Sequence, residues 1–520
     1  MVIGAGLGGL CAAALLARRG MDVLVLEAHS IPGGAAHAWE RGGYTFESGP
    51  SLYSGMSDRP SDNPIGQVLH ALEEELPCEK YNTWMVHMPE DDESAMGSFL
   101  TSIGDDGASF KEALRKYRGE RAVREWEALL SIMSPLAAAS GAVPAMAVRE
   151  DFGNLLTIGR CLLKNWRALD LDAVRSLAKP FADVMDDVIT DPFLKNWMDM
   201  LCFLLSGRKA DGTLAAEIGF MFGEWYKPSA CLEFPKGGSG AIVDALVRGL
   251  KKNGGALRLG AEVEEIITDG GGRATGVRMR RGGAIVRARR AVVSNASIWD
   301  TGRMLTDEVD KERLASTTGQ TRRCESFVHL HLGIDATGLP EDLQMHHIFV
   351  KDWELGVDSP QNLCLVSIPS VIDPTLSPPG KHVIHAYTPG TEPYEIWEHL
   401  DRSSDEYKAL KRARSEILFE AVEKAIPDVR DRIEIEMIGT PLTHKRFLRR
   451  CDGTYGGYGW VGGSSTAVAP SSGTGIDGLL CVGDSMFPGP GVPAVAAGGA
   501  ILANSLSPVM EHYALLEKVL

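Results

Sequence analysis

The first part of the chain alternates between apolar segments and a glycine-rich turn. Met1, Val2 and Ile3 form a short apolar start, glycines follow, and the small-residue stretch CAAALLARRG reads as a helix that can pack closely on a sheet. The next stretch, MDVLVLE, is continuously apolar and ends at Glu27. Strands buried on both faces of a parallel sheet have this pattern. It predicts a strand, a tight turn, a helix and a second parallel strand.

Comparable apolar segments occur far downstream. Residues 233–300 read as a helix over 241–253, followed by strands that are broken by glycine turns and end in the buried stretch AVVSNA. LLCVGD, at 479–484, reads as another short buried strand, and a small-residue helix follows from about Val492. We therefore expect an α/β fold in which a Rossmann-like domain is discontinuous in the sequence.

The segments between these pieces have a different pattern. The first is mainly helical, and the second contains the strand-like stretches CESFVHLHLG, QNLCLVSIPSVID and KHVIHAYT. We expect residues 1–75, 233–300 and 440–520 to form the Rossmann-like domain. Residues 76–232 and 301–439 are expected to form an inserted α+β domain that binds the substrate.

One helix of the first insertion is strongly amphipathic. Its apolar stripe contains Leu155, Leu156, Leu162, Leu163, Trp166 and Leu169, and its other side carries Arg160, Lys164 and Arg167. A basic amphipathic helix of this kind can lie on a membrane surface. The alternative, which we favour slightly, is a helix that turns its apolar stripe to its own core, because most amphipathic helices do so.

The glycine-rich turn carries the first chemical signal. Gly4, Gly6 and Gly9 form a G-x-G-x-x-G motif between the predicted strand and helix, and Glu27 follows at the end of the second strand. Glycines at such positions allow a tight turn and the close approach of backbone N–H groups to a pyrophosphate, which the helix N-terminus also favours. Glu27 can accept hydrogen bonds from ribose hydroxyls, and its charge disfavours a 2′-phosphate. The motif predicts a dinucleotide other than NADP.

Two further segments favour FAD over NAD. Gly33 and Gly34 follow the acid closely, where backbone without side chains can pass close to a flavin and its ribityl chain. Near the C-terminus, Gly483 and Asp484 end a predicted strand, and Asp484 can bind ribityl hydroxyls or flank the pyrophosphate. Gly491 and Val492 begin the following helix, whose N-terminus can face the pyrimidine end of the flavin ring.

The adenine end of the cofactor is expected near Val263, in the strand-like stretch GAEVEEI. No second G-x-G-x-x-G unit of similar quality occurs, so we expect no separate nicotinamide site. No C-x-x-C pair occurs either, which excludes the dithiol chemistry of disulfide reductases. The flavin is therefore expected to exchange electrons with a substrate, a quinone, oxygen or a protein donor.

Composition narrows the partners. The 520 residues carry a formal net charge of −16, which argues against a nucleic-acid partner. Nine cysteines are scattered singly, as is typical of buried thiols in a reducing compartment. An unbroken apolar run of about 18 residues is missing, so a membrane-spanning helix is not expected.

Histidines and acids give no clear catalytic group. His329 and His331 share one face of a predicted strand, but no third metal ligand is evident in the sequence, so no metal site is predicted. His346 and His347 have the same interpretation. The catalytic residues remain unknown at this point.

Several stretches resemble the carotenoid isomerases (prolycopene isomerases), within the phytoene desaturase group of FAD-dependent oxidoreductases. They are VLVLEAHSIPGGAAHAWERGGYTFESGPS, FPKGGSGAIVDALVRGL, VVSNASIWDT, CLVSIPSVIDPTLSPPGKHVIHAYT, GTPLTHKRFLRRCDGTYGG and CVGDSMFPGPGVPAVA, in the family's order along nearly the whole chain. The resemblance implies a flavoprotein that acts on a long polyene at a plastid membrane. In these isomerases reduced FAD is required without net redox change. His444 and Glu47, near the family's motifs, are expected to be structural or to orient the flavin.

Two departures from the family pattern keep alternatives open. Glu47 stands where the family usually has Asp, and Pro490 and Pro493 stand in FPGPGVPAVA where the isomerases have FPGQGV followed by IAV. Pro493 is similar to the pattern of carotene desaturases. A desaturase, saturase or hydratase of the same family is therefore an alternative. An amine oxidase or a flavin-binding escort protein fits the motifs less well, because the first needs an aromatic cage and the second does not need the flavin-facing glycines.

The beginning of the chain is also unusual. A first strand normally has about five residues before the glycines, whereas only Met1, Val2 and Ile3 precede Gly4 here. We expect a truncated gene model or fragment, with a transit peptide upstream.

Overall fold

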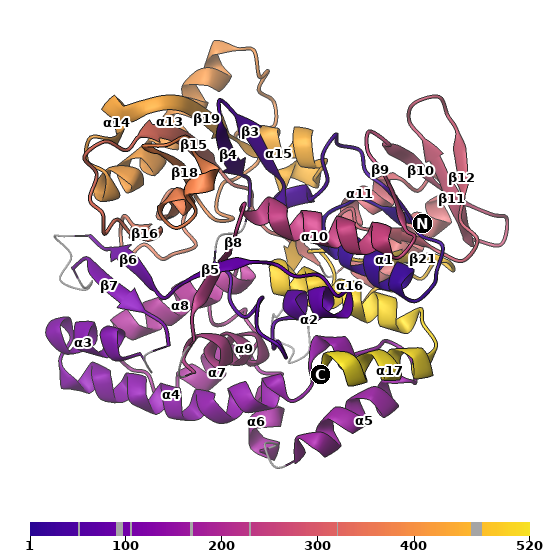
Figure 1. Cartoon of the computed structure of the whole chain (residues 1–520), viewed down its shortest axis with the longest axis horizontal. Helices are drawn as coiled ribbons and strands as arrows, with labels where there is room; N and C mark the ends of the chain where they lie inside the picture. Colours follow the sequence, from indigo (N-terminus) through magenta and orange to yellow (C-terminus); the bar gives the residue numbers. More distant parts are fainter. Residues whose placement is uncertain are drawn as a thin grey trace.

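A parallel sheet lies at the centre of the half of the molecule that contains the N-terminus (Figure 1). The computed structural model describes residues 1–49, 52–89, 97–104, 107–166, 170–227, 230–319, 321–458 and 471–520. In sheet order the strands are β21 (Leu479–Cys481), β13 (Val292–Ser294), β1 (Val2–Ile3), β2 (Leu24–Leu26) and β9 (Ala256–Arg258), and every neighbouring pair is parallel. Three distant parts of the chain thus build one sheet. The fold is the predicted α/β fold with a Rossmann-like sheet.

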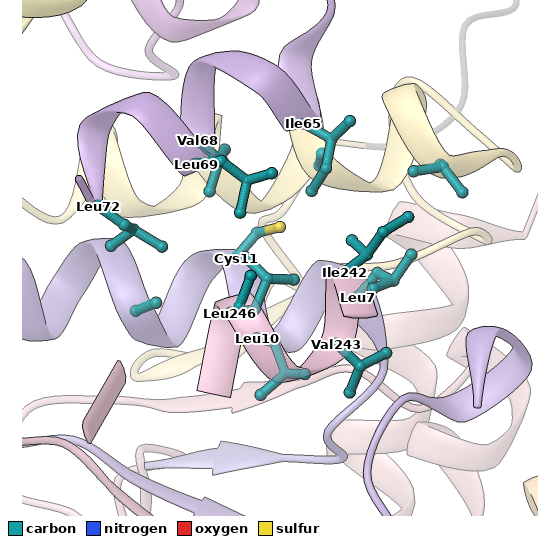
Figure 2. Close-up of a cluster of buried hydrophobic side chains, with 14 of the residues drawn as sticks. Leu7, Leu10, Cys11, Ile65, Val68, Leu69, Leu72, Ile242, Val243 and Leu246 are labelled. Carbon is teal, nitrogen blue, oxygen red and sulfur yellow. The ribbon is translucent and has the colours of Figure 1, made fainter. Parts of the chain in front are cut away.

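Small side chains allow the helices to pack closely against this sheet and one another. Helix α1 (Leu7–Arg18) contacts both α10 (Ser239–Lys252) and α16 (Val492–Ser505), and α2 (Pro64–Ala71) covers α16. Figure 2 shows their apolar residues meeting around Cys11, which is fully buried. A Cβ on Gly499 of α16 would lie 2.8 Å from the Cβ of Cys11, so only glycine allows this approach.

A second, larger sheet belongs to the other half. Its order is β19 (Ile433–Gly439), β15 (His329–Asp335), β18 (Lys381–Tyr387), β17 (Leu363–Ser367), β16 (His346–Val350), β6 (Thr83–His87) and β7 (Phe99–Ser102). Both predicted insertions contribute strands to it. The domain boundaries given above remain a prediction, but the two sheets show which segments fold together.

Helices enclose the lower part of the view in Figure 1. They are α3 (Ala108–Tyr117), α4 (Glu120–Gly141), α5 (Asn154–Lys164), α6 (Leu171–Ser176), α7 (Phe181–Met185), α8 (Pro192–Ser206) and α9 (Ala215–Trp225). The remaining helices are α11 (Ile298–Arg303), α12 (Glu308–Thr318), α13 (Asp405–Ala425), α14 (Val429–Arg432), α15 (Pro441–Leu448) and α17 (Val509–Val519).

The other strands form small sheets. One sheet has three strands, β10 (Val263–Thr268), β11 (Ala274–Met279) and β12 (Ile285–Arg287). The two-stranded sheets pair β3 (Ala38–Arg41) with β4 (Tyr44–Glu47), β5 (Cys78–Tyr81) with β8 (Leu232–Pro235), and β14 (Arg322–Arg323) with β20 (Gly457–Tyr458).

One helix bears on the expectation that the chain has no membrane-spanning helix. The segment Glu120–Ala147 is long and apolar enough to cross a membrane, by length and composition. Serines and prolines interrupt its apolar residues, so a search for an unbroken apolar run misses it. Within this segment α4 packs against α9, and Trp126, Leu129 and Met133 form part of its buried stripe.

The interpretation of the amphipathic helix also changes. We slightly favoured a helix that turns its apolar stripe to the core, but the buried residues of α5 are Thr157 and Cys161. Leu155, Leu156 and Leu163 are exposed instead. On the other side, Arg160 lies over the Tyr513 ring, and the Lys164 ammonium donates to the carbonyl oxygen of Leu520. The predicted stripe residue Leu169 and the predicted basic residue Arg167 lie outside the described residues.

All nine cysteines are free thiols, as predicted. Seven are buried, and burial raises the pKa of the Cys324 thiol to about 12. The Cys324 thiol is therefore neutral, and buried thiols of this kind behave as small apolar side chains.

Candidate active site

A cavity of about 750 Å³ runs from the parallel sheet into the helical half. Ten of the residues that the sequence singled out border it: Gly4, Gly6, Glu27, Gly33, Gly34, Val263, Gly483, Asp484, Gly491 and Val492. They come from the carboxyl ends of strands and the helix N-termini that follow, which is where open α/β sheets bind ligands. Segments far apart in the sequence thus form one wall.

The two N-terminal glycine turns form a continuous backbone surface. Gly33 donates its N–H to the carbonyl oxygen of Ala5 at 2.8 Å, and Gly6 and Gly33 form an isolated parallel bridge. Gly33 has φ +118°, and a Cβ on Gly34 would lie 3.1 Å from the Cα of Gly6. A side chain at either position would strain the backbone or fill the space beside it. We call this glycine-lined backbone surface the cradle, because a ligand can lie directly against it.

Two helices begin at this surface. The residues before α1 and α16 are Gly6 and Gly491, and a glycine has no side chain to cap the first turn. The unpaired N–H groups and the positive ends of both helix dipoles can therefore bind an anion or a ring that becomes negative on reduction. Gly8 joins the two regions, because its Cβ would lie 3.3 Å from the Cα of Gly483.

Gly9 has a different position from the other motif glycines. It lies behind the turn, where a Cβ would be 2.5 Å from the carbonyl oxygen of Gly4 and 2.9 Å from the Cβ of Asn295. Gly9 therefore allows α1 to pack against the strand end instead of lining the cavity.

Glu27 holds the turn as well as facing the cavity. One carboxylate oxygen accepts a hydrogen bond from the N–H of Ala5 and the other from the N–H of His29, both at 2.7 Å. A carboxylate can accept further bonds, so these contacts are compatible with ribose hydroxyls as additional donors. They also fix the carboxylate beside the glycine turn.

Two residues on the cavity wall, Asn295 and Arg450, were not found from the sequence. Asn295 follows β13 and lies among the glycines, with its Oδ1 3.0 Å from where a Gly483 Cβ would be. The rule that ligands bind at carboxyl ends of strands could have pointed to it. Arg450 forms an ion pair with Asp484, so this acid is neutralised by a partner that the sequence did not indicate. His329 also borders the cavity.

Histidines gather at this wall, where His329 and His444 both line the cavity. The sequence showed no third ligand near His329 and His331, but β18 supplies His385, and nitrogens of the three lie within 4.8 Å of one another. The ring of His444 in α15 lies 4.8 Å from that of His329, with the two planes tilted by 37°. Burial lowers the pKa of His444 to about 3. The histidines are therefore neutral imidazoles near pH 7.

Glu47 lies at the start of α10 instead of on the cavity wall. Its carboxylate accepts a hydrogen bond from the N–H of Ser239. Burial raises the pKa of Glu47 to about 7, although the bond to Ser239 opposes this effect. This placement agrees with the structural role expected for Glu47.

The far end of the cavity is apolar. It is lined there by residues of α8 and α9, namely Leu201, Phe203, Leu204, Leu205, Phe220 and Met221. Phe220 and Glu224 also line a second cavity of about 340 Å³, which reaches Asn165 at the end of α5. The polar glycine cradle and the apolar arm thus belong to one continuous site.

Comparison with known proteins agrees with this arrangement. Residues 7–430 match the family of flavin containing amine oxidoreductases. Prolycopene isomerase 1, chloroplastic, of an Oncidium hybrid cultivar is 32% identical over 514 residues, which cover 98% of this chain and 83% of that protein. The chloroplastic prolycopene isomerase of Daucus carota is 32% identical over 516 residues, covering 98% and 79%. The neurosporene-forming phytoene desaturase of Rhodobacter capsulatus is 26% identical over 537 residues, covering 97% and 93%.

Solved structures show the same fold. An oxidoreductase from Methanosarcina mazei superimposes with a TM-score of 0.60 at 20% identity, covering 96% of this chain and 98% of that one. Putrescine oxidase bound to putrescine gives a TM-score of 0.60 at 14% identity, covering 97% and 98%. At these identities the likeness concerns the fold alone.

Proposed function

Because the chain belongs to the flavin containing amine oxidoreductase family, and within it to the group of prolycopene isomerases, we propose that it is an FAD-dependent carotenoid cis–trans isomerase acting on a poly-cis polyene such as prolycopene. The observation that carries the proposal is one cavity that joins a glycine cradle to an apolar arm. A long hydrocarbon matches the arm, and a dinucleotide matches the cradle.

The cradle residues would hold FAD in the following way. Gly4, Gly6 and the start of α1 would receive the pyrophosphate, and Glu27 the ribose. Gly33 and Gly34 would lie against the ribityl chain, Val263 near the adenine, and Gly483 with Asp484 near the ribityl or pyrophosphate groups. Gly491 and Val492 would face the flavin ring. When bound in its reduced form, FAD supplies reversible electron exchange with a polyene.

Isomer analysis tests this function directly. The purified protein with reduced FAD is incubated with poly-cis-lycopene in liposomes, and the isomers are followed by chromatography. The expected result is a shift toward trans isomers at constant mass. An unchanged isomer composition, with flavin bound, contradicts the proposal.

A redox reaction on the same polyene is the second candidate. Pro493 lines the cavity, and it is the position at which the chain differs from the isomerase pattern and is similar to the desaturase pattern. Product mass separates the reactions, because a desaturase removes two hydrogens per turnover, a saturase adds two and a hydratase adds water.

We further propose that the protein docks on a membrane through an apolar surface around α5, called here the α5 patch. It comprises Phe152, Leu155, Leu156, Leu163, Trp166 and Leu171, which are 94%, 77%, 63%, 77%, 64% and 70% exposed. Exposed apolar residues gathered in this way mark interaction sites. A lipid surface suits them because it can deliver a water-insoluble polyene.

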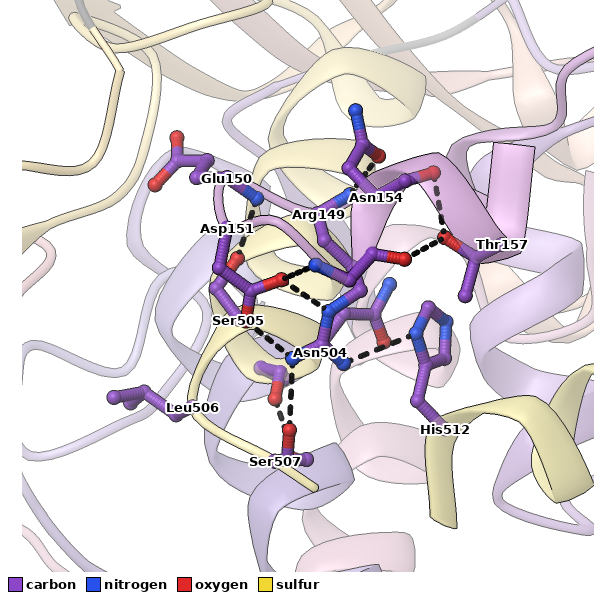
Figure 3. Close-up of polar contacts among 12 residues, drawn as sticks. Arg149, Glu150, Asp151, Asn154, Thr157, Asn504, Ser505, Leu506, Ser507 and His512 are labelled. Carbon is purple, nitrogen blue, oxygen red and sulfur yellow. Dashed lines mark hydrogen bonds and ion pairs between the residues drawn. The ribbon is translucent and has the colours of Figure 1, made fainter. Parts of the chain in front are cut away.

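The α5 patch is held rigidly at its base. Buried Arg149 donates to both oxygens of Asp151, to the carbonyl oxygen of Ser507 and to His512 (Figure 3). Asn504 of α16 donates to the carbonyl oxygens of Met146 and Val148. These bonds tie the loop before α5 to α16 and α17.

The second cavity supports this orientation of the protein. It lies between the main cavity and Asn165, which donates to the carbonyl oxygen of Ala142. Phe220 and Glu224 line both cavities. A polyene that leaves a membrane beside α5 would therefore have to pass only these side chains to enter the apolar arm.

A plastid location is proposed for this protein because its relatives in plants are chloroplastic. Fluorescent tagging of the full-length transcript product in its own cells tests this location. A signal confined to the cytosol would contradict it.

A further inference from the structure

Two neighbouring strands bring three histidine rings together at the edge of the cavity. Strands β15 and β18 are antiparallel, and their register places His331 directly opposite His385. His329, two residues before His331, points to the same face of the sheet. All three side chains are buried. The sequence separates His385 from the other two, so only strand pairing reveals the group.

His329 and His385 are joined by a hydrogen bond in the plane of their rings. The Nδ1 of His329 lies 2.7 Å from the Nε2 of His385, the ring centres are 5.0 Å apart and the ring planes differ by 11°. This combination means that the rings lie edge to edge. Since a neutral imidazole has one N–H and one lone pair, the pair can pass a proton along its axis.

His329 borders the cavity, and its Nε2 is buried without a hydrogen-bond partner among the residues that the structure describes. A buried nitrogen without a partner is unusual, because its desolvation is then uncompensated. It therefore points to a ligand or substrate as the missing partner.

A metal ion is the other chemistry that three histidines can support. The ring planes here are unfavourable for it. The rings of His331 and His385 stack with centres 4.6 Å apart and planes 4° from parallel, so their in-plane lone pairs do not converge on one point. The Nε2 of His331 already donates to the carbonyl oxygen of Glu47 at 2.8 Å. The geometry favours the hydrogen-bonded pair over a metal centre.

We propose that His329 is the proton-transfer residue of the polyene cavity and that His385 positions it. The inference rests on the proposed isomerase function and names the group that moves the proton. In the step, neutral His329 first takes up a proton from solvent at Nε2. The Nε2–H bond of this imidazolium then breaks, and a π-electron pair of the polyene forms a C–H bond to one of its carbons. The positive charge spreads along the polyene and the former double bond rotates. This rotation turns the original hydrogen of that carbon toward Nε2, its C–H bond breaks and returns H⁺ to Nε2, and its electron pair re-forms the double bond. Atoms and electrons balance without an added oxidant or reductant.

The surroundings make the imidazolium of His329 a strong acid. The titratable groups that face it are His331 on its own strand, His385 and Tyr387 on β18, His444 on α15, and His37. Burial lowers the pKa of His329 well below its usual value, and the neighbouring histidines lower it further. His385 holds the other ring nitrogen of His329 in the hydrogen-bonded pair, so removal of His385 would leave His329 without its orienting partner and hinder proton release and return.

Deuterium exchange tests the proposal with the holoenzyme. The flavin-loaded protein is incubated with poly-cis-lycopene in D₂O, and the deuterium content of product and recovered substrate is measured by mass spectrometry. We expect deuterium in both. His329→Gln should bind flavin normally, lower the rate by about 100-fold and abolish exchange. His347→Gln is the matched control. His347 on β16 forms the same kind of N···N contact with His87 on β6, at 3.0 Å, elsewhere in the same seven-stranded sheet.

His385 is tested by a conservative and a non-conservative change. His385→Gln keeps an acceptor for the Nδ1 proton and should retain part of the rate, whereas His385→Leu should lose most of it and move the pH profile. A purely structural role would lower flavin binding in both variants without moving the profile.

The outcomes separate this inference from the proposed function. Product without deuterium, or a wild-type rate in His329→Gln, overturns the role of His329 while leaving isomerisation intact. If no isomer forms, the proposed function fails. Deuterium in the recovered polyene would then still support proton transfer by His329, and a recovered polyene without deuterium would contradict it. The inference would also be overturned if the holoenzyme contained one equivalent of a transition metal and the His331→Gln variant had lost that metal.

Discussion

The N–H of Gly33 donates to the carbonyl oxygen of Ala5 at 2.8 Å, so two separate glycine-rich turns form one wall of the cavity. Neither turn can move without the other. The backbone at both is therefore prepared for a ligand before the ligand arrives, which reduces the entropy lost on binding.

Gly33→Ala should weaken flavin binding by at least about tenfold. Gly33 has φ +118°, and its added Cβ would lie 3.0 Å from both the Cα of His37 and the Cγ2 of Val243. An alanine held in this left-handed conformation also lowers the free energy of unfolding by about 1–3 kcal/mol. Flavin affinity is measured by fluorescence quenching, and stability by urea unfolding.

Gly20→Ala is the matched control for this change. Gly20 has φ +75°, but its Cβ would meet nothing within 4 Å, and it follows α1 at the end away from the cavity. We expect a loss of stability with unchanged flavin affinity. Equal losses of affinity in the two variants would show that the cradle has no special role.

Arg450→Met should impair flavin binding by leaving the carboxylate of Asp484 without its partner. Both side chains are largely buried, with 19% and 16% exposure. Removal of one partner from such a pair costs about 1–3 kcal/mol, below the value for a fully buried pair. In the double variant with Asp484→Asn the unpaired charge is gone, so part of the stability should return. A double-mutant cycle by urea unfolding measures this coupling, and strictly additive losses would contradict it.

Charged residues in the α5 patch should abolish membrane binding. Leu163→Glu combined with Leu156→Glu places two carboxylates on the exposed apolar surface. Substitutions at exposed positions usually change stability by no more than about 0.5 kcal/mol. A loss of co-sedimentation with liposomes would therefore show that the α5 patch binds the membrane, because the variant would still be folded. Leu355→Glu, at a leucine that is 59% exposed elsewhere, is the control. Retained binding in the double variant would exclude the α5 patch as the docking site.

The protein should lose stability as the pH falls below the pKa of an ordinary histidine. Burial lowers the pKa of His512 to about 4, and Arg19 and Arg149 contribute to this lowering. The unfolded chain therefore binds a proton at higher pH than the folded chain, so stability falls as the pH decreases through about 6.5. The loss from this one residue is about 2 kcal/mol at about pH 5.

His512→Gln tests that contribution. Glutamine can donate to the carbonyl oxygen of Met146 and accept from Arg149, as His512 does at 2.6 and 3.3 Å, but it does not titrate. The difference in unfolding free energy between about pH 7 and about pH 5 should shrink relative to wild type. An unchanged difference would mean that His512 is not an acid-sensitive contact.

The sequence predicted the parts of the site that depend on short-range pattern. Gly4, Gly33 and Gly483 were found because strand, turn and helix follow one another within a few residues. His385 and Arg450 were not found, because the register of β18 against β15 and the return of α15 toward Asp484 bring them to the site. Their partners lie at distances that no local period encodes.

The direction of α5 shows a second limit. Hydrophobic periodicity identified Leu155 and Leu163 as members of one stripe, and the helix exists. Which side of a helix is covered depends on its neighbours, and here α17 covers the side with Arg160. Periodicity gives the apolar direction of a helix but not its position relative to the core.

The order of strands in the parallel sheet has a consequence for synthesis of the protein. Strand β21, at Leu479–Cys481, pairs with β13, and β1 lies on the other side of β13. A nascent chain that ends before β21 therefore exposes a sheet with an open edge and a cradle that lacks Gly483 and α16. The cofactor cannot hold the earlier strands together until these later residues have been synthesised, so the open sheet edge must avoid pairing with other chains for as long as that takes.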